Sequence, residues 1–437
     1  MNSRSAHSFF MSLRYLTSLM LIFIVACGGS GGDGNTPAET SPELMWTRQW
    51  GTSLNDSSKG VAIDSSGNIY VCGYSNSSID GIANQGGFDA FLKKFDQAGN
   101  WIWTRPLATV ENDYAAGITV DADDFIYVTG DTQGDLNGNI NSGSTNAFIA
   151  KFDSSGNTLW TKLSGAITGE TGVAVAADGN SNVYVMGVTF ENDVDPFHPG
   201  NSDVFLSKYD ASGLLQWRRV FGSTEGDDGY GLAADGDGNL LITGHTGGNL
   251  NGNTNAGGAD AFIVKYSSPG VLLWTRTLGS SGDDLARSVA VDQRGNAYVT
   301  GYTNGNLEGN IYQGNGDAFI AKYDGSGNLQ WTRLLGSSGQ EFGYAIRADG
   351  EGSVYVTGST DGNFGGNSNA GLTDVFLAKY DSAGSKKWTK TVGSLESERG
   401  FAVDVRNGNI CITGVTVGNL DGYTNLGSSD VFLLKFH

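Results

Sequence analysis

A carboxylate recurs every 57 residues along most of this 437-residue chain. Seven like charges brought into one ring would repel one another unless cations or neighbouring bases offset them. The set therefore predicts either a site for a cation or cationic ligand, or seven structural acids that accept backbone hydrogen bonds or pair with bases. Its members are Asp56, Asp113, Glu170, Asp227, Asp284, Glu341 and Glu398.

Asparagine is the second residue type that repeats in a pattern suited to chemistry. Five repeats carry variants of the motif GNLxGNxNxG, for example in residues 248–257. Asn amides can bind sugar hydroxyls and Asn or Asp oxygens suit calcium, although Asn-Gly pairs also form ordinary turns. Calcium is therefore a candidate ion, and the sequence requires no cofactor. The candidate ligand residues are Asn249, Asn251, Asn253, Asn306, Asn310, Asn363 and Asn367.

Histidine is too scattered to predict a catalytic centre. His198, His245 and His437 occupy different positions in their repeats, so neither a metal cluster nor a Ser-His-Asp or Cys-His set can be assigned. No catalytic residue is predicted, and a non-enzymatic role is expected. Paired acids for glycoside hydrolysis stay open as an alternative, because 46 Asp and Glu residues offer many pairs.

The elements that carry these residues follow from the same period. In the unit formed by residues 274–330, four runs rich in β-branched and aromatic residues predict strands at 288–292, 297–303, 317–323 and 329–334. Turns of the form Asp-x-x-Gly-Asn join the first two runs and the last two. The carboxylate lies shortly before the first run. Seven tryptophans mark seven such units: Trp46, Trp103, Trp160, Trp217, Trp274, Trp331 and Trp388.

Four antiparallel strands repeated seven times predict an all-β fold, a seven-bladed β-propeller over residues 44–437. The chain opens with a fourth-type strand at 44–50 and closes with a third-type strand at 430–436. The N-terminal strand is therefore expected to complete the last blade, which leaves no open sheet edge.

Two sets of bases recur with the period. An Arg or Lys stands two residues after each Trp, and a Lys precedes the final aromatic residue of each third strand. We expect these bases to pair with the acids that begin the third strands, such as Asp317 and Asp374.

The run VAVDxxGNxYVTGxT…DAFxAKYDxxGNxxW resembles the SBBP (seven-bladed β-propeller) repeat of bacterial surface and secreted proteins. The resemblance covers about residues 44–437. It implies the propeller fold and an extracytoplasmic setting, and it implies no single activity.

The N-terminal residues predict a lipoprotein signal peptide at 1–26. Arg4 and Arg14 precede an apolar stretch at 16–26 that is too short to span a bilayer. The sequence IVACG at 24–28 resembles a bacterial lipobox, which implies cleavage before Cys27 and acylation of that residue. Acyl chains would then hold the protein on a membrane, and the glycine after the cysteine favours the bacterial outer membrane.

A flexible Gly/Ser-rich tether is expected at residues 27–43, between this anchor and the propeller. A nucleic-acid partner is disfavoured, because 46 acids and 26 bases give a formal net charge of -20. Cys72 and Cys411 fall on the second strands of neighbouring blades, where we expect two buried free thiols rather than a disulfide.

Together these features predict a monomeric, lipid-anchored module of the cell envelope, exposed either to the surface or to the periplasm. It would bind a polysaccharide or an envelope protein. The alternatives are a carbohydrate-active propeller enzyme, either hydrolase or lyase, and a scaffold for outer-membrane assembly. The strand pattern does not choose among these, because propellers host all of them.

Overall fold

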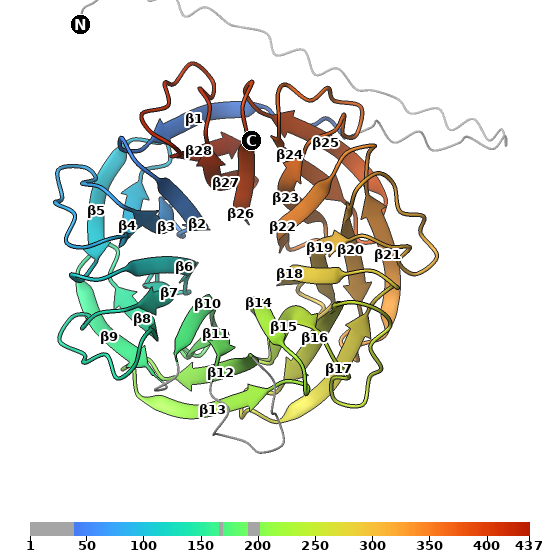
Figure 1. Ribbon diagram of the computed structural model, residues 1–437, viewed down its shortest axis with the longest axis horizontal. Helices are drawn as coiled ribbons and strands as arrows, with labels where there is room; N and C mark the ends of the chain where they lie inside the picture. Colours follow the sequence, from blue (N-terminus) through green and yellow to red (C-terminus); the bar gives the residue numbers. More distant parts are fainter. Residues whose placement is uncertain (1–38, 166–168, 191–201) are drawn as a thin grey trace, which may run out of the picture. The chain divides into compact units, whose positions relative to one another are not determined.

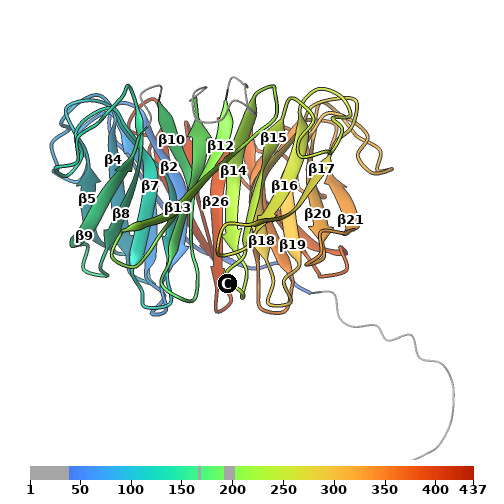
Figure 2. The ribbon, with the colours of Figure 1, turned by 90° about the horizontal axis from the view of Figure 1, so that it is seen from below.

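Seven four-stranded antiparallel sheets stand as blades around a central channel in the computed structural model, which describes residues 39–165, 169–190 and 202–437 (Figure 1). Figure 2 shows the ring from the side, with the connections between strands gathered at its two faces. The predicted seven-bladed β-propeller is confirmed. No helix in these described ranges is long and apolar enough to cross a membrane.

Each blade contributes one strand to each of four concentric layers. The inner strands are β2 (Asp56–Ile63), β6 (Asp113–Val120), β10 (Glu170–Ala177), β14 (Asp227–Ala234), β18 (Asp284–Val291), β22 (Glu341–Ala348) and β26 (Glu398–Arg406). The second strands are β3 (Ile69–Ser75), β7 (Ile126–Thr132), β11 (Val183–Thr189), β15 (Leu240–Thr246), β19 (Ala297–Thr303), β23 (Val354–Thr360) and β27 (Asn409–Thr416).

The third and outer strands complete the blades. The third strands are β4 (Asp89–Phe95), β8 (Asn146–Phe152), β12 (Asp203–Tyr209), β16 (Asp260–Tyr266), β20 (Asp317–Tyr323), β24 (Asp374–Tyr380) and β28 (Asp430–Phe436). The outer strands are β5 (Trp101–Leu107), β9 (Thr158–Ser164), β13 (Leu215–Phe221), β17 (Leu272–Leu278), β21 (Leu329–Leu335), β25 (Lys386–Val392) and β1 (Leu44–Trp50). Blades 1 to 6 run from β2 to β25 in chain order, and blade 7 joins β26, β27, β28 and β1.

Closure of the ring depends on both ends of the chain. Strand β1 pairs antiparallel with β28, from Leu44 opposite Phe436 to Trp50 opposite Val431. This pairing confirms that the N-terminal strand completes the last blade. Because the first strand fills the last sheet, opening the ring would break a ladder of backbone hydrogen bonds rather than a side-chain contact alone.

The inner strands begin earlier than the sequence pattern predicted. In the fifth blade the strand starts at Asp284, not at residue 288, because Asp284 already pairs with Thr303 of β19. The repeated carboxylate is therefore the first residue of a strand rather than part of the preceding loop. The outer strand β21 likewise extends one residue further, to Leu335.

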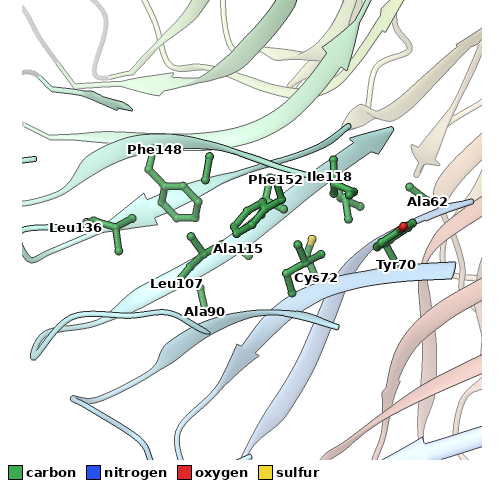
Figure 3. Close-up of a cluster of buried hydrophobic side chains, with 14 of the residues drawn as sticks. Ala62, Tyr70, Cys72, Ala90, Leu107, Ala115, Ile118, Leu136, Phe148 and Phe152 are labelled. Atoms are coloured by element: carbon green, nitrogen blue, oxygen red, sulfur yellow. The ribbon is translucent and has the colours of Figure 1, made fainter. Parts of the chain in front are cut away.

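The hydrophobic core lies between adjacent blades. Figure 3 shows the junction of blades 1 and 2, where Tyr70 and Cys72 of β3 pack near Ile118 of β6 and Phe152 of β8. Cys411 belongs to a different cluster, so the two thiols do not meet. Both cysteines are free and buried, as expected, and burial raises the pKa of each thiol to about 12.

A second contact between blades joins an outer-strand tryptophan to a turn of the next blade. At the junction of blades 3 and 4 the partners are Trp217 of β13 and the turn between β16 and β17, which contains Gly270. The Arg219 Nε donates to the Gly270 carbonyl at 2.9 Å, and the Trp217 Nε1 donates to the Ser268 carbonyl at 3.1 Å. We call this arrangement the tryptophan–glycine lock.

Only glycine fits beneath the tryptophan. Gly270 has a φ of +83°, and an added Cβ would lie 3.0 Å from the Trp217 ring. The same relation holds at six of the seven junctions, with Trp46, Trp103, Trp160, Trp217, Trp274 and Trp331 against Gly99, Gly156, Gly213, Gly270, Gly327 and Gly384 respectively. The glycines are thus selected both by backbone conformation and by packing.

The recurring bases serve these junctions, and the prediction that they pair with the third-strand acids was wrong. Lys94 and Lys322 donate at 2.8 Å to carbonyls of Ser154 and Ser382 in the next blade, as Arg219 does to Gly270. Within the described ranges, no ion pair joins one of these bases to a third-strand acid. Turn carbonyls that point outward from the neighbouring blade are the nearer acceptors.

Two Gly-to-Ala substitutions separate packing from backbone strain. Gly270→Ala should lower the free energy of unfolding by about 2–4 kcal/mol. The alanine would have to adopt the left-handed backbone conformation, and its Cβ would clash with Trp217. Gly295→Ala should cost only about 1–2 kcal/mol, because its φ is +78° but nothing lies within 4 Å of the new Cβ. Denaturant unfolding monitored by tryptophan fluorescence measures both. Equal losses in the two variants would contradict the lock.

A candidate binding site at the mouth of the channel

Every inner strand contains a β-bulge at the same position. In β2, Ser58 pairs with Gly73 and Gly60 pairs with Cys72, so Lys59 is an extra residue without a partner. The same shift occurs in the other six inner strands. A bulge breaks the alternation of side chains along a strand and redirects the extra residue.

A glycine in each second strand makes room for the bulge. A Cβ on Gly73 would lie 2.0 Å from the Ser57 carbonyl oxygen, and one on Gly301 would lie 1.8 Å from that of Leu285. Backbone cannot yield to such contacts, so any larger residue would displace the inner strand. Glycine inside a strand is a known sign of a bulge, and here it recurs in each repeat.

The seven bulges turn seven side chains into the channel. These residues line one cavity of about 290 Å³ that all seven blades share. They differ in type from blade to blade, unlike the residues that pack between blades. The bulge residues are Lys59, Ala116, Val173, Tyr230, Arg287, Tyr344 and Phe401. We call the end of the channel where the inner strands begin the channel mouth.

Aromatic rings form an arc in two parts around much of this mouth. The aromatic arc comprises Tyr302, Phe342, Tyr344, Phe401, Tyr74 and Tyr114, from blades 5, 6, 7, 1 and 2. Tyr302 stacks on Phe342 with ring centroids 4.6 Å apart, and Tyr344 meets Phe401 edge to face at 5.3 Å. Each ring is half-buried, so the arc keeps apolar surface in contact with solvent.

Lys59 bridges the two parts of the arc. Its Nζ lies 4.2 Å from the centroid of the Phe401 ring and 5.6 Å from that of Tyr74. Tyr74 in turn meets Tyr114 edge to face at 4.9 Å. Burial and the nearby Arg399 lower the pKa of the Lys59 ammonium, because both disfavour its charged form.

A polar group of four residues, the blade 4–5 cluster, faces the mouth beside the arc. The Arg287 guanidinium lies 4.1 Å from the centroid of the Tyr230 ring, and Tyr230 stacks on His245 at 5.6 Å. The Tyr230 hydroxyl donates to Asp228 at 3.4 Å, and the His245 Nε2 lies 3.9 Å from the same carboxylate. Burial lowers the pKa of His245, so its imidazole is neutral at pH 7.

Two nitrogens of this cluster are buried without a hydrogen-bond partner. They are the Arg287 Nε and the His245 Nδ1. A buried donor or acceptor without a partner is costly, and such groups in folded proteins usually receive a partner from water or ligand. A ligand or water in the channel would therefore supply the missing hydrogen-bond partners of Arg287 and His245.

An ion pair lies at the channel wall beyond the bulge residues. Arg347 of β22 lies 3.2 Å from Asp404 of β26, and Asp404 also accepts the backbone N–H of Ile63 at 2.8 Å. Arg406 donates to the Ile63 carbonyl at 2.9 Å. Blades 6, 7 and 1 are thereby joined at the channel wall.

The predicted carboxylate set does not line this cavity. Each member is buried at the start of an inner strand and accepts hydrogen bonds from a Ser or Thr of its own blade junction. Asp113 accepts the backbone N–H and the hydroxyl of Thr109 at 2.6 and 2.9 Å, and Glu341 accepts the Ser337 N–H at 2.7 Å. In the described ranges no group of three or more His, Cys, Asp or Glu residues could hold a metal ion.

The inner-strand acids meet the third-strand acids of the preceding blade. An added Cβ on Gly51 would lie 2.2 Å from Asp430 Oδ1 and 2.9 Å from Asp56 Oδ2, so these two carboxylates approach each other around one glycine. The Oδ1 atoms of both residues are buried without a hydrogen-bond partner. A buried pair of acids of this kind favours retention of a proton.

One junction replaces the pair with an ion pair. At the junction of blades 2 and 3, Asn146 stands where the other third strands begin with an Asp. Here Glu170 contacts the Arg218 guanidinium and the Ser164 hydroxyl. The buried inner-strand carboxylate is thus offset by a cation where its acidic neighbour is missing.

The candidate asparagines hold their own loops together. The Asn253 and Asn310 amides donate at 3.0 and 3.0 Å to the carbonyls of Leu250 and Leu307, and Asn367 donates at 3.1 Å to Phe364. The side-chain oxygens of Asn249, Asn306 and Asn363 accept backbone N–H groups six residues later, and the Asn251 amide donates to Thr275. Their amides serve as turn formers in the described loops.

The channel residues were missed in the sequence because they are not repeated. Comparison between copies singles out residues that every blade needs, which are the packing and turn positions. The bulge position carries a different residue in each blade, so it has no such signal. The glycine in each second strand could have located the bulge and, with it, the side chains that face the channel.

Stability should fall as the pH rises from 5 to 7.5. Burial raises the pKa of Asp56, Asp113, Asp260 and Asp374, and burial together with Glu341 raises that of Asp317 to about 6. A carboxyl with a raised pKa in the folded state stabilises the fold below its unfolded pKa of 3.8, and this contribution is lost as the pH rises through the folded value. Thermal unfolding across this pH range measures the effect.

A substitution should reduce this pH dependence. Asp317→Asn removes one titrating group and introduces the residue that blade 2 already carries at the equivalent position, Asn146. Its melting temperature should fall less between pH 5 and 7.5 than that of the unmodified chain. Asp123→Asn, at an exposed turn, serves as the control. A melting temperature that is constant or increases over this range would contradict the paired-acid interpretation.

Known proteins share this architecture. A family model described as Beta-propeller repeat (SBBP) matches residues 46–80, 102–137, 216–251, 273–308 and 330–365. An uncharacterized WD repeat-containing protein of Acanthamoeba polyphaga mimivirus is 22% identical over 478 residues, which cover 80% of this chain and 34% of that protein. The regulatory protein FlaEY of Caulobacter vibrioides is 26% identical over 350 residues, covering 69% of this chain and 36% of that protein.

The chain spans about a third of the length of these two curated relatives. Among solved structures, the WD40 β-propeller domain of Doa1 superposes with a TM-score of 0.53 at 12% identity, covering 91% of this chain and 97% of that domain. At this identity the likeness concerns the fold alone. Five segments of this chain thus match the SBBP β-propeller repeat, within a propeller of seven blades.

Proposed function

We propose that this protein is a non-enzymatic binding module that holds a polysaccharide at its channel mouth. The observation that carries the proposal is the aromatic arc, whose Tyr344 and Phe401 rings line a cavity of about 290 Å³ that all seven blades share. Binding sites are typically concave, largely apolar and supplied with a few placed polar groups. The channel mouth is concave and combines aromatic rings with a few placed polar groups.

A sugar ring matches this surface in two ways. Its C–H face is apolar and can lie against an aromatic ring, while its hydroxyl rim needs donors and acceptors. The arc supplies the first, and the tyrosine hydroxyls and the blade 4–5 cluster supply the second. The site is also rigid, because the bulge residues stand on strands rather than on long loops.

The setting that we propose is the outer membrane of a bacterium. Cys27 would carry the acyl anchor and residues 27–43 would tether the propeller, as the lipobox-like sequence indicates. Cys27 and residues 28–38 lie outside the described residues. The propeller would act as a monomer, because the ring closes on itself and uses its own first strand to complete the last blade.

A carbohydrate-active enzyme is the second candidate, on one specific observation. The blade 4–5 cluster places a neutral imidazole, a phenol and a carboxylate within contact at the same mouth. Such groups can transfer protons when they reach a substrate. Incubation of the protein with a polysaccharide that it binds would leave the chain length unchanged if the protein only binds, and shorten it if this second candidate holds.

Loss of one ring of the arc should weaken polysaccharide binding. Tyr344→Ala and Phe401→Ala should each raise the Kd of a polysaccharide found on a glycan array by about tenfold, because a stacking surface worth about 1–1.5 kcal/mol is removed. Isothermal titration with the purified full-length chain measures Kd. Running it in calcium and in EDTA also tests the candidate ion.

Trp101→Ala is the matched control, because this ring is 53% exposed on the outer strand β5, away from the channel. It should leave Kd unchanged. Circular dichroism and the unfolding midpoint report whether each variant remains folded. Full binding by folded Tyr344→Ala and Phe401→Ala variants would overturn the assignment of the site.

A further inference from the structure

We propose that the polysaccharide held at the channel mouth is anionic, and that Lys59 and Arg287 bind its acidic groups. This inference rests on the proposed function and specifies its ligand. The two residues are bulge residues of blades 1 and 5, and both line the shared cavity. The aromatic arc extends between them through blades 6 and 7.

Lys59 is a cation without a counterion. It is half-buried, and within the described ranges no carboxylate lies within ion-pair distance of its Nζ. The faces of Phe401 and Tyr74 offset part of the cost of burying the charge, but cation–π contacts do not replace a counterion. Arg399 adds a second positive charge nearby, which lowers the pKa of Lys59 further. An acidic group between the two would relieve this repulsion.

Arg287 is the second cation without a counterion. Its Nε is buried without an acceptor, and its guanidinium plane lies over Tyr230 rather than against a carboxylate. A guanidinium presents parallel N–H groups that match the two oxygens of a carboxylate or a sulfate. The unpartnered donor therefore points to a planar or tetrahedral oxyanion supplied by the ligand.

Several other arginines of the chain have acceptors for their N–H groups or carboxylate partners. Arg219 and its equivalents use their N–H groups in the tryptophan–glycine locks. Arg218 pairs with Glu170, and Arg347 pairs with Asp404. In a chain with a net charge of -20, cations left unpaired in one cavity attract anions to that cavity against the general field of the protein.

The acids at the mouth restrict where the ligand charge can lie. Asp228 contacts Tyr230 and His245, and burial raises the pKa of Asp131 to about 7, so that Asp131 is partly protonated at neutral pH. Asp228 stands on blade 4 and Asp131 on blade 2. The acidic groups of the ligand would thus face blades 1 and 5 and avoid the carboxylate of blade 4.

The experiment compares polymers that share a backbone and differ in charge. Binding of polygalacturonate to the full-length chain is measured by isothermal titration beside that of its methyl ester, and dextran sulfate is measured beside dextran. We expect tighter binding of a charged polymer than of its neutral partner by at least about tenfold, with an affinity that falls as salt is raised. The two pairs distinguish carboxylate from sulfate as the group that is bound.

Charge variants then locate the contact. Lys59→Gln and Arg287→Gln should each weaken binding of the charged polymer by about tenfold and weaken binding of the neutral polymer by a smaller factor. Arg287→Lys keeps the charge and loses the paired N–H groups, so it should recover only part of the affinity. The controls are Arg294→Gln, in the exposed turn after β18, and Lys386→Gln, on the outer strand β25.

The outcomes separate the two proposals. Equal affinity for charged and neutral polymers, or unchanged binding in folded Lys59→Gln and Arg287→Gln variants, would overturn the anionic ligand and leave polysaccharide binding intact. Binding of no polymer and of no glycan on the array would overturn the proposed function itself.

Discussion

The contact between an outer-strand tryptophan and a glycine turn of the next blade is the constraint on which the ring depends. A propeller has no core inside a single sheet, because each blade buries its faces only against its neighbours. The Trp217 ring over Gly270, with Arg219 bonded to the same turn, fixes how far and at what angle blade 4 follows blade 3. Six such locks, and the sheet that joins β1 to β28, repeat one small rotation until the ring closes.

A closed ring with closely similar junctions frees the residues at its centre. Because the main packing residues recur from blade to blade, the inner-strand bulge brings the residue at one position into the channel seven times. These residues take no part in the locks and can differ without cost to the fold. Lys59, Tyr230, Arg287 and Phe401 show this divergence, whereas the tryptophans do not. Function and scaffold are therefore carried by separate positions of one repeat.

The buried carboxylates belong to the scaffold and are tied to its chemistry. They cap the loops that enter the inner strands, as Asp113 does with Thr109, and they approach the third-strand acids across a glycine. Two buried acids can lie together when one keeps its proton. Glu170 has Asn146 as its neighbour instead of an acid, and its charge is offset by Arg218. A repeated acid was the most conspicuous chemical signal in the sequence, yet its partners are within the blade junction.

The sequence by itself determined the number of blades, the four strands of each and the closure by the first strand. These features rest on local chemistry that repeats: turn glycines, Asp side chains that bond their own backbone, and apolar strands of fixed spacing. Tertiary structure alone decided which side chains meet in the channel. A bulge cancels the alternation that sequence patterns assume, and the arc joins Tyr302, Phe401 and Tyr114 from blades far apart in the chain. Their proximity exists only because the ring closes.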